Sequence, residues 1–145
     1  MRAAVTRCSE AAVEVDGEIV GRLPAPGLLV LVGVTHADDE HEAAKLARKL
    51  ANLRILDGEL GAVDAGAPLL VVSQFTLYGD ARKGRRPSWS AASGRDHSEP
   101  LVERFCELLR AEGLHVETGV FGAMMRVSSV NEGPFTVLLD SAELA

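Results

Sequence analysis

The sequence predicts one compact domain of the α/β class, built from a β-sheet and two main helices. Two continuous apolar runs, residues 28–34 and 69–72, are rich in branched side chains and have the length of buried strands. Two other segments, near residues 43–53 and 98–113, repeat apolar side chains at helical spacing. The length of 145 residues suits a single hydrophobic core, so we expect residues 1–145 to form one domain.

The first third of the chain is predicted to form strands followed by a helix. Residues 2–8 have the pattern of a strand, and residues 13–20 that of a hairpin, because Asp16-Gly17 supplies the positive φ angles of a tight turn. The run at 28–34 is the next strand. The helix after it is predicted from one apolar stripe, which consists of Ala43, Leu46, Ala47, Leu50 and Leu53.

The middle of the chain alternates loops with a strand and a helix. Residues 56–68 are rich in Gly, Asp and Ala and are predicted to be a loop before the strand at 69–72. Residues 79–97 lack periodicity, and a loop of that length in a compact domain is usually functional. The signals of the second helix are a cap at Ser98, a first-turn proline at Pro100 and a stop at Gly113.

The last part of the chain is predicted to be three strands, at residues 115–118, 124–130 and 135–140. Asn131-Glu132-Gly133-Pro134 separates the last two strands and has the composition of a turn. We therefore expect a turn between these two strands.

Composition and charge narrow the possible functions. Hydrophobic residues make up 47% of the chain and aromatic residues only 4%, which predicts a core of small aliphatic side chains that gains stability by oligomerisation. A formal net charge of −6 argues against a nonspecific polyanion binder. Cys8 and Cys106 lie far apart, which favours a reducing, cytoplasmic location. We expect no signal peptide and no membrane span, since the longest apolar run is too short.

The first candidate site is the segment directly after the buried strand at 69–72, which reads Ser73-Gln74-Phe75-Thr76. Clefts open at strand ends, and backbone N–H groups freed from the sheet there can stabilise the oxyanion of an acyl-transfer transition state. The alternative is a strand that turns at the surface and uses its hydroxyls for local backbone bonds. These residues alone leave both interpretations open.

The second candidate is the turn that begins at Asn131 and continues through Gly133 and Pro134 to Thr136. A Gly-Pro bond has a cis–trans gap of only about 0.5–1 kcal/mol, so a fold is able to hold it cis. The alternative is plain turn chemistry between two strands.

The third candidate is a basic loop with four cations within five residues, namely Arg82, Lys83, Arg85 and Arg86. In an acidic chain such a cluster suggests contact with phosphate, and Trp89 beside it could stack on a base. The alternative is a solvated loop paired with nearby acids.

The positions of the histidines and cysteines disfavour a zinc site and a cysteine nucleophile. His36 and His41 do not belong to a His-Glu-x-x-His pattern, and neither cysteine has a neighbouring histidine that would activate it. The sequence contains neither a phosphate loop nor a dinucleotide fingerprint. We therefore expect neither a metal nor a cofactor.

Taken together, the segments resemble the D-aminoacyl-tRNA deacylases. The resemblance rests on Ser-Gln-Phe-Thr-Leu-Tyr-Gly-Asp at 73–80, Arg-Lys-Gly-Arg-Arg-Pro-Ser at 82–88 and Asn-Glu-Gly-Pro-Phe-Thr at 131–136, in that order. It also includes the hairpin, the strand at 28–34 and residues 117–124, and so covers nearly the whole chain.

The resemblance implies a β-barrel-like, mostly antiparallel sheet core flanked by the two helices. It also implies a homodimer that hydrolyses the ester of D-aminoacyl-tRNA, with no membrane partner. Gly133 and Pro134, joined by a cis bond, would enter the partner subunit's site, present backbone carbonyls to the substrate's α-amino group and reject the L-amino acid by a clash. Glycine has no side chain to clash, so mischarged glycyl-tRNA(Ala) is an expected secondary substrate.

The resemblance also implies the roles of the candidate residues. The catalytic set is Ser73, Gln74, Phe75 and Thr76, the substrate-binding set is Asn131, Gly133, Pro134 and Thr136, and the tRNA-binding set is Arg82, Lys83, Arg85 and Arg86. The N–H groups of Phe75 and Thr76 are the candidates for the oxyanion hole, with help from the ribose 2′-OH of the tRNA. Thr76 as a covalent nucleophile is the minor alternative.

Two functions of other classes also stay open. One is a catalytically silent tRNA-binding module, and the other is a hydrolase of small esters or D-peptides.

Overall fold

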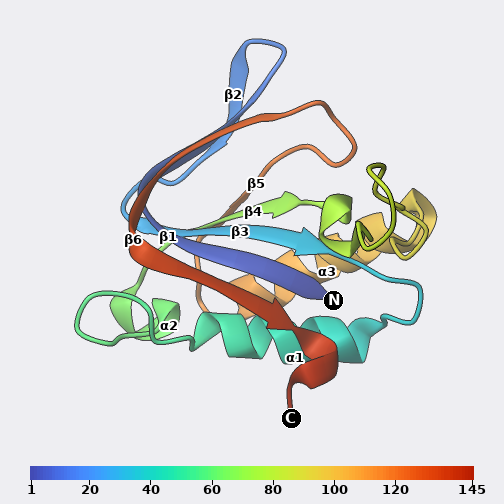
Figure 1. Ribbon diagram of the computed structural model, residues 1–145. Helices are drawn as coiled ribbons and strands as arrows, with labels where there is room; N and C mark the ends of the chain where they lie inside the picture. Colours follow the sequence, from blue (N-terminus) through green and yellow to red (C-terminus); the bar gives the residue numbers. More distant parts are fainter.

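The computed structural model describes residues 1–145 and contains one curved, six-stranded sheet with helices packed against it (Figure 1). The elements in chain order are β1 (Arg2–Val15), β2 (Glu18–Arg22), β3 (Gly27–Gly33), α1 (Glu40–Ala51), α2 (Ala62–Ala65), β4 (Leu69–Ser73), η1 (Phe75–Tyr78), α3 (Arg95–Ala111), β5 (Val116–Thr118), β6 (Arg126–Asp140) and η2 (Ser141–Glu143). None of the helices is long and apolar enough to cross a membrane.

The sheet has the strand order β2-β1-β3-β4-β5, with β6 on the other side of β1. β1 pairs antiparallel with β2, β3 and β6, whereas β3, β4 and β5 are parallel. The predicted α/β class with a barrel-like sheet and two main helices is confirmed. The sheet differs from the predicted mostly antiparallel one in that it contains both antiparallel and parallel pairs. The parallel pairs arise because the β3–β4 connection passes through α1 and the β4–β5 connection passes through α3.

The predicted hairpin at Asp16-Gly17 is confirmed, with φ angles of 50° and 82° at these two residues. The strand predicted at 2–8 extends further, because β1 continues without a break to Val15. Its burial alternates along most of its length, which is the pattern of a strand with one face on the core.

The turn predicted between residues 124–130 and 135–140 is wrong. Both halves belong to one long strand, β6, which pairs with β1 instead of with itself. Asn131 lies opposite Cys8 and Thr136 lies opposite Thr6, so residues 132–135 bulge out opposite the single residue Arg7. A proline lacks the N–H that a ladder needs, and a turn and a bulge both accommodate it. The local composition therefore could not distinguish them.

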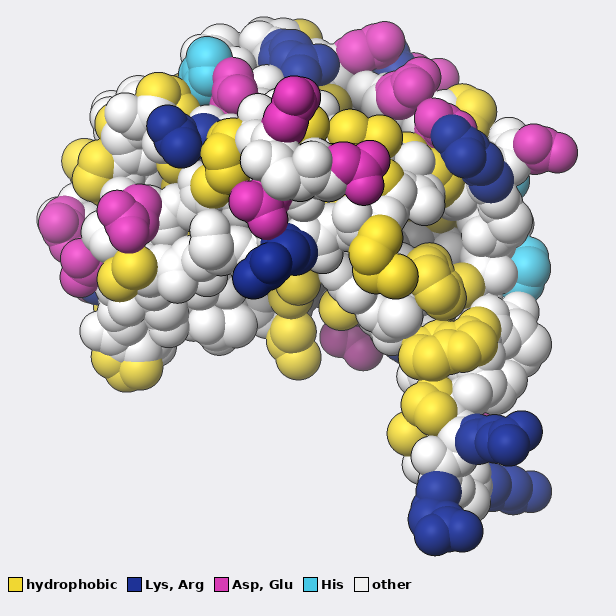
Figure 2. Space-filling model, turned by 90° about the horizontal axis from the view of Figure 1, so that it is seen from above, with side chains coloured by type: hydrophobic (Ala, Val, Ile, Leu, Met, Phe, Trp, Pro, Cys, Tyr) yellow, Lys and Arg dark blue, Asp and Glu magenta, His cyan; other side chains and the backbone are white.

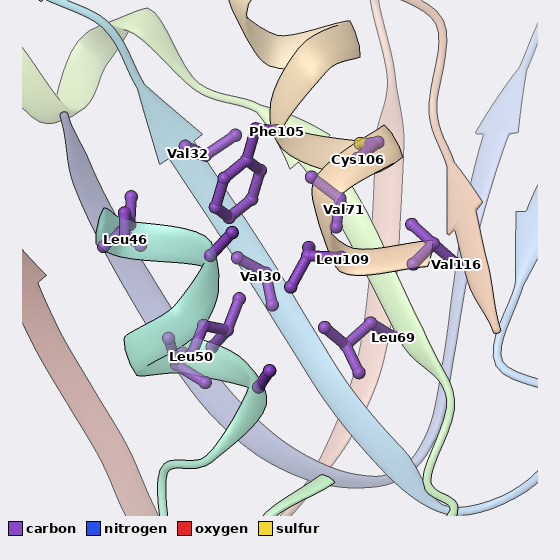
Figure 3. Close-up of a cluster of buried hydrophobic side chains, with 14 of the residues drawn as sticks. Val30, Val32, Leu46, Leu50, Leu69, Val71, Phe105, Cys106, Leu109 and Val116 are labelled. Atoms are coloured by element: carbon purple, nitrogen blue, oxygen red, sulfur yellow. The ribbon is translucent and has the colours of Figure 1, made fainter. Parts of the chain in front are cut away.

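Two helices cover one face of the sheet and enclose the main core (Figure 3). Aliphatic side chains of β3 and β4 meet the apolar stripes of α1 and α3, with Phe105 fully buried between them. The stripe predicted for α1 is confirmed except for Leu53, which lies after the helix ends at Ala51. The helix starts after Asp39, whose carboxylate accepts a bond from the Glu42 N–H.

The cap predicted for the second helix is wrong by four residues, since it is Gly94 rather than Ser98 and α3 begins at Arg95. Ser98 lies inside the helix, where its hydroxyl donates to the Gly94 carbonyl, and Pro100 is also an internal residue. The stop predicted at Gly113 is confirmed by a φ of 90°. The loop predicted at 56–68 contains the short helix α2.

Candidate active site

The segment Ser73 to Thr76 leaves the sheet where β4 ends beside β3. The Gln74 N–H donates to the carbonyl of Val32 at 2.7 Å, and this is the last backbone hydrogen bond between the segment and the sheet. The chain then turns into η1, whose first internal bond runs from the Leu77 N–H to the Gln74 carbonyl at 3.2 Å. The N–H groups of Phe75 and Thr76 precede that bond, so η1 supplies no partner for them.

A cavity of about 300 Å³ opens at this point between the ends of β3 and β4, the first turns of α3 and the loop before β6. Its lining residues are Val32, Gly33, Val34, Val72, Ser73, Gln74, Phe75, Ser93, Ser98, Val102, Phe121, Gly122, Ala123, Met124, Met125 and Val127. The set contains no Asp, Glu, His, Lys, Arg or Cys. The cavity can therefore offer a ligand apolar walls, hydroxyls, one amide and backbone groups, but no side chain that would act as a general base at neutral pH.

The four predicted catalytic residues lie together, but they do not all face this cavity. Ser73, Gln74 and Phe75 line it, whereas Thr76 does not. The Gln74 amide donates a hydrogen bond to the Thr76 hydroxyl, which fixes the two side chains relative to each other.

The four predicted substrate-binding residues lie on or beside the bulge of β6, away from the cavity of their own chain. The peptide bond between Gly133 and Pro134 is cis, and none of the residues 131–136 lines the cavity. The Asn131 amide donates to the carbonyls of Arg7 at 2.9 Å and Phe135 at 3.4 Å, so it shapes the bulge. Within one chain the structure therefore does not bring the segment at 73–76 and the bulge together.

Arg7 was not predicted from the sequence as a candidate residue, but it contacts the bulge. It lies opposite the bulge, and its Nε donates to the Glu132 carbonyl at 2.9 Å while its guanidinium lies 4.4 Å from the centre of the Phe135 ring. Nη1 also bonds Asp57 at 3.1 Å. The sequence gives no distinct signal for it, because β1 contains other charged residues such as Arg2, Glu10 and Glu14.

The basic loop forms an arm that leaves the body of the protein (Figure 2). Asp80 and Ser88 exchange two backbone hydrogen bonds of 2.8 Å that close its base, and its tip carries Lys and Arg side chains. Arg82 donates to both carboxylate oxygens of Asp80, and these bonds hold the pKa of Asp80 down at about 2. The remaining cations of the arm, Lys83, Arg85 and Arg86, form no ion pair.

The two cysteines are buried, which agrees with the expectation that neither is a nucleophile. Burial raises the pKa of the Cys106 thiol to about 11 and also raises the pKa of Cys8. A thiol attacks as thiolate, and both shifts disfavour that form. No three side chains of His, Cys, Asp or Glu are placed to hold a metal ion.

Comparisons with known proteins agree on one family. The family model described as D-Tyr-tRNA(Tyr) deacylase matches residues 4–140. A D-aminoacyl-tRNA deacylase of Thermobifida fusca is 66% identical over 140 residues, which cover 97% of this chain and 99% of the relative. A D-aminoacyl-tRNA deacylase of Micrococcus luteus is 59% identical over 145 residues, which cover 100% and 97%.

Two solved structures have the same fold. The structure of a c-Myc DNA unwinding element binding protein superposes with a TM-score of 0.89 at 34% identity, over 97% of this chain and 98% of the other. A probable eukaryotic D-amino acid tRNA deacylase gives a TM-score of 0.82 at 18% identity, over 95% and 97%. The second likeness concerns the fold alone.

Proposed function

The chain belongs to the D-Tyr-tRNA(Tyr) deacylase family, and from this premise we propose that it hydrolyses the ester of D-aminoacyl-tRNA to free D-amino acid and tRNA in the cytoplasm. The observation that carries the proposal is the cavity lined by Ser73, Gln74 and Phe75, which contains no titratable side chain. Such a site suits a substrate that supplies its own group for proton transfer. The 2′-OH of an aminoacylated ribose is such a group.

The proposed reaction is attack of water on the ester carbonyl. The N–H groups of Phe75 and Thr76 would bind the oxyanion, and donors of this kind typically contribute a factor of about 10²–10³ in kcat. The 2′-OH of the terminal ribose would assist proton transfer, since the cavity provides no base. Ser73 and Gln74 would hold the ester end of the substrate against this segment.

The bulge of a second copy of the chain would distinguish D- from L-amino acids in the cavity. Residues 131–136 do not reach the cavity of their own chain, so Gly133 and Pro134 can act there only from a partner. β6 supports such a homodimer, because it exposes apolar side chains along its length, including Leu138 at 77% and Val130 at 48%. Two backbone carbonyls would bind the α-amino group, and an L-side chain would meet the bulge.

This geometry also predicts a secondary substrate. Rejection by a clash requires a side chain, and glycine has none. Mischarged glycyl-tRNA(Ala) should therefore be deacylated as well. Asn131 and Thr136, which flank the bulge, would support substrate recognition indirectly. Asn131 donates to two backbone carbonyls, and Thr136 pairs with β1.

Replacing Thr76 with alanine should leave kcat within about tenfold of the wild-type value, because the hydroxyl does not line the cavity and the proposed donor is the backbone N–H. Intact-mass spectrometry of quenched reactions should detect no acyl-enzyme. A trapped acyl group on Thr76 would instead support a covalent nucleophile.

The arm is proposed to bind tRNA phosphates near the acceptor end. Lys83, Arg85 and Arg86 are its free cations, while Arg82 contributes less because Asp80 already neutralises it. The variant with alanine at both 85 and 86 should bind tRNA more weakly, and the slope of log K against log salt should fall by about 1–2. Nitrocellulose filter binding at several salt concentrations measures both. Unchanged binding would favour a hydrolase of small esters, for which the arm is idle.

The function is tested by incubating purified protein with D-Tyr-tRNA and measuring released D-tyrosine. Release under single-turnover conditions supports the enzyme. Tight binding without release would favour the silent tRNA-binding module.

A further inference from the structure

The indole of Trp89 lies between the cationic arm and the segment that borders the cavity. Its ring centroid is 5.5 Å from that of Phe75, with an interplanar angle of 74°, which is an edge-to-face contact. Trp89 itself does not line the cavity. Any influence of the indole on the cavity must therefore pass through the residues that it contacts.

The indole touches both ends of the short turn η1. Phe75 is the first residue of η1, and Gly79 follows its last residue. A Cβ atom added at Gly79 would lie 2.6 Å from the indole Cζ3, so the ring rests directly on the backbone there. The indole thus covers the turn whose N–H groups face the proposed oxyanion.

Trp89 is itself held on the side away from η1. It directly follows Ser88, which closes the base of the arm with Asp80, and its own carbonyl accepts from the Ala92 N–H at 3.0 Å. Beyond it, the Ser90 carbonyl is 2.7 Å from His36 Nε2, and the Ser93 N–H donates to Val34 at 3.0 Å. The backbone on both sides of Trp89 is therefore held, on one side by the base of the arm and on the other by the segment after β3.

We propose that Trp89 is a positioning residue that holds η1, and with it the Phe75 and Thr76 N–H groups, in the geometry needed for hydrolysis. The inference rests on the proposed function. It differs from stacking of Trp89 on an RNA base. The positioning role predicts that the indole affects kcat, whereas stacking would affect the affinity for tRNA. Edge-to-face aromatic pairs are stabilising and directional, and a displacement of about 1 Å at a catalytic group can reduce the rate a hundredfold.

The test compares two substrates, D-tyrosyl-tRNA and 2′(3′)-O-D-tyrosyl-adenosine, the second of which has no phosphate for the arm. Trp89→Ala should lower kcat about ten- to a hundredfold on both substrates. Gly79→Ala should act in the same direction, since its Cβ would lie 2.6 Å from the indole and 3.0 Å from the Thr76 carbonyl oxygen and would therefore disturb both the indole contact and η1. Trp89→Phe keeps an aromatic edge and should restore kcat to within about threefold of the wild type.

The outcomes separate the alternatives. Unchanged kcat on the adenosine ester in Trp89→Ala would overturn the inference, and an effect confined to KM for full tRNA would show base stacking instead. Equal losses in the Phe and Ala variants would also overturn it. Wild-type protein that hydrolyses neither substrate would overturn the proposed function itself and the inference with it.

Discussion

Replacing Arg7 with alanine is expected to lower kcat/KM for D-aminoacyl-tRNA about a hundredfold, or about 2.7 kcal/mol of transition-state stabilisation. Arg7 is the one β1 residue opposite the bulge, and it bonds the Glu132 carbonyl and covers the Phe135 ring. A hydrogen bond to a charged group contributes about 1.5–3 kcal/mol and a cation–π contact about 0.5–2 kcal/mol. Without them the backbone of the bulge loses its fixed orientation.

The matched control for Arg7 is Asp57→Asn. Asp57 is a fully exposed partner of the same guanidinium and does not touch the bulge. Its replacement should change kcat/KM less than about threefold, because exposed ion pairs are weak. Steady-state deacylation assays on the two variants measure the difference. An Arg7→Ala enzyme with wild-type kcat/KM would show that the bulge does not take part in turnover.

A second large effect is expected at Gly33, the last residue of β3. A Cβ added there would lie 2.9 Å from the Gln74 carbonyl oxygen and 3.2 Å from the Leu77 Cβ, both on the segment that borders the cavity. The nearest atom belongs to the backbone, so the clash is relieved only by moving that segment. Gly33→Ala should therefore reduce kcat about thirty- to a hundredfold, with an overpacking cost to stability of about 1–3 kcal/mol.

Gly94→Ala is the matched control for this substitution. A Cβ at Gly94 meets nothing within 4 Å, and the residue has an ordinary φ of −70°. It should retain kcat, and thermal unfolding monitored by circular dichroism should report the stability of both variants. If Gly33→Ala folds and keeps wild-type kcat, the exact position of residues 74–77 does not limit the reaction.

The same two variants test whether the bulge acts across subunits. In a dimer with one Arg7→Ala chain and one Gly33→Ala chain, one site would combine an intact cavity with an intact bulge, and the other site would have both defects. A heterodimer purified by two different tags should therefore recover about half of the wild-type activity. Activity no higher than that of either parent variant would place the bulge and the cavity in the same subunit, against the proposal.

The parts of the fold that depend on local periodicity could be predicted from the sequence. The stripe that includes Leu46 and Leu50, the apolar runs of β3 and β4 and the tight turn at Gly17 each have a signal within a few residues. The candidate segments after Ser73 and around Gly133 were also found, because strand ends and Gly-Pro pairs are visible in the sequence.

The features that depend on pairing between distant residues could not be predicted. The bulge of β6 exists because both of its flanks pair with β1, and Arg7 becomes important only through this register. The neutralisation of Arg82 by Asp80 and the contact of Trp89 with Phe75 depend on the hairpin form of the arm. The early start of α3 at Arg95 shows the same limit, since Ser98 and Pro100 look like start signals but are accommodated inside the helix.

The most direct test of the central claim is deacylation of matched D-Tyr-tRNA and L-Tyr-tRNA, prepared on the same tRNA and assayed at the same enzyme concentration. We expect rapid release of D-tyrosine and a release of L-tyrosine no faster than spontaneous hydrolysis, because the L-side chain would clash with the backbone at Gly133 and Pro134. Equal rates on the two substrates would contradict the claim.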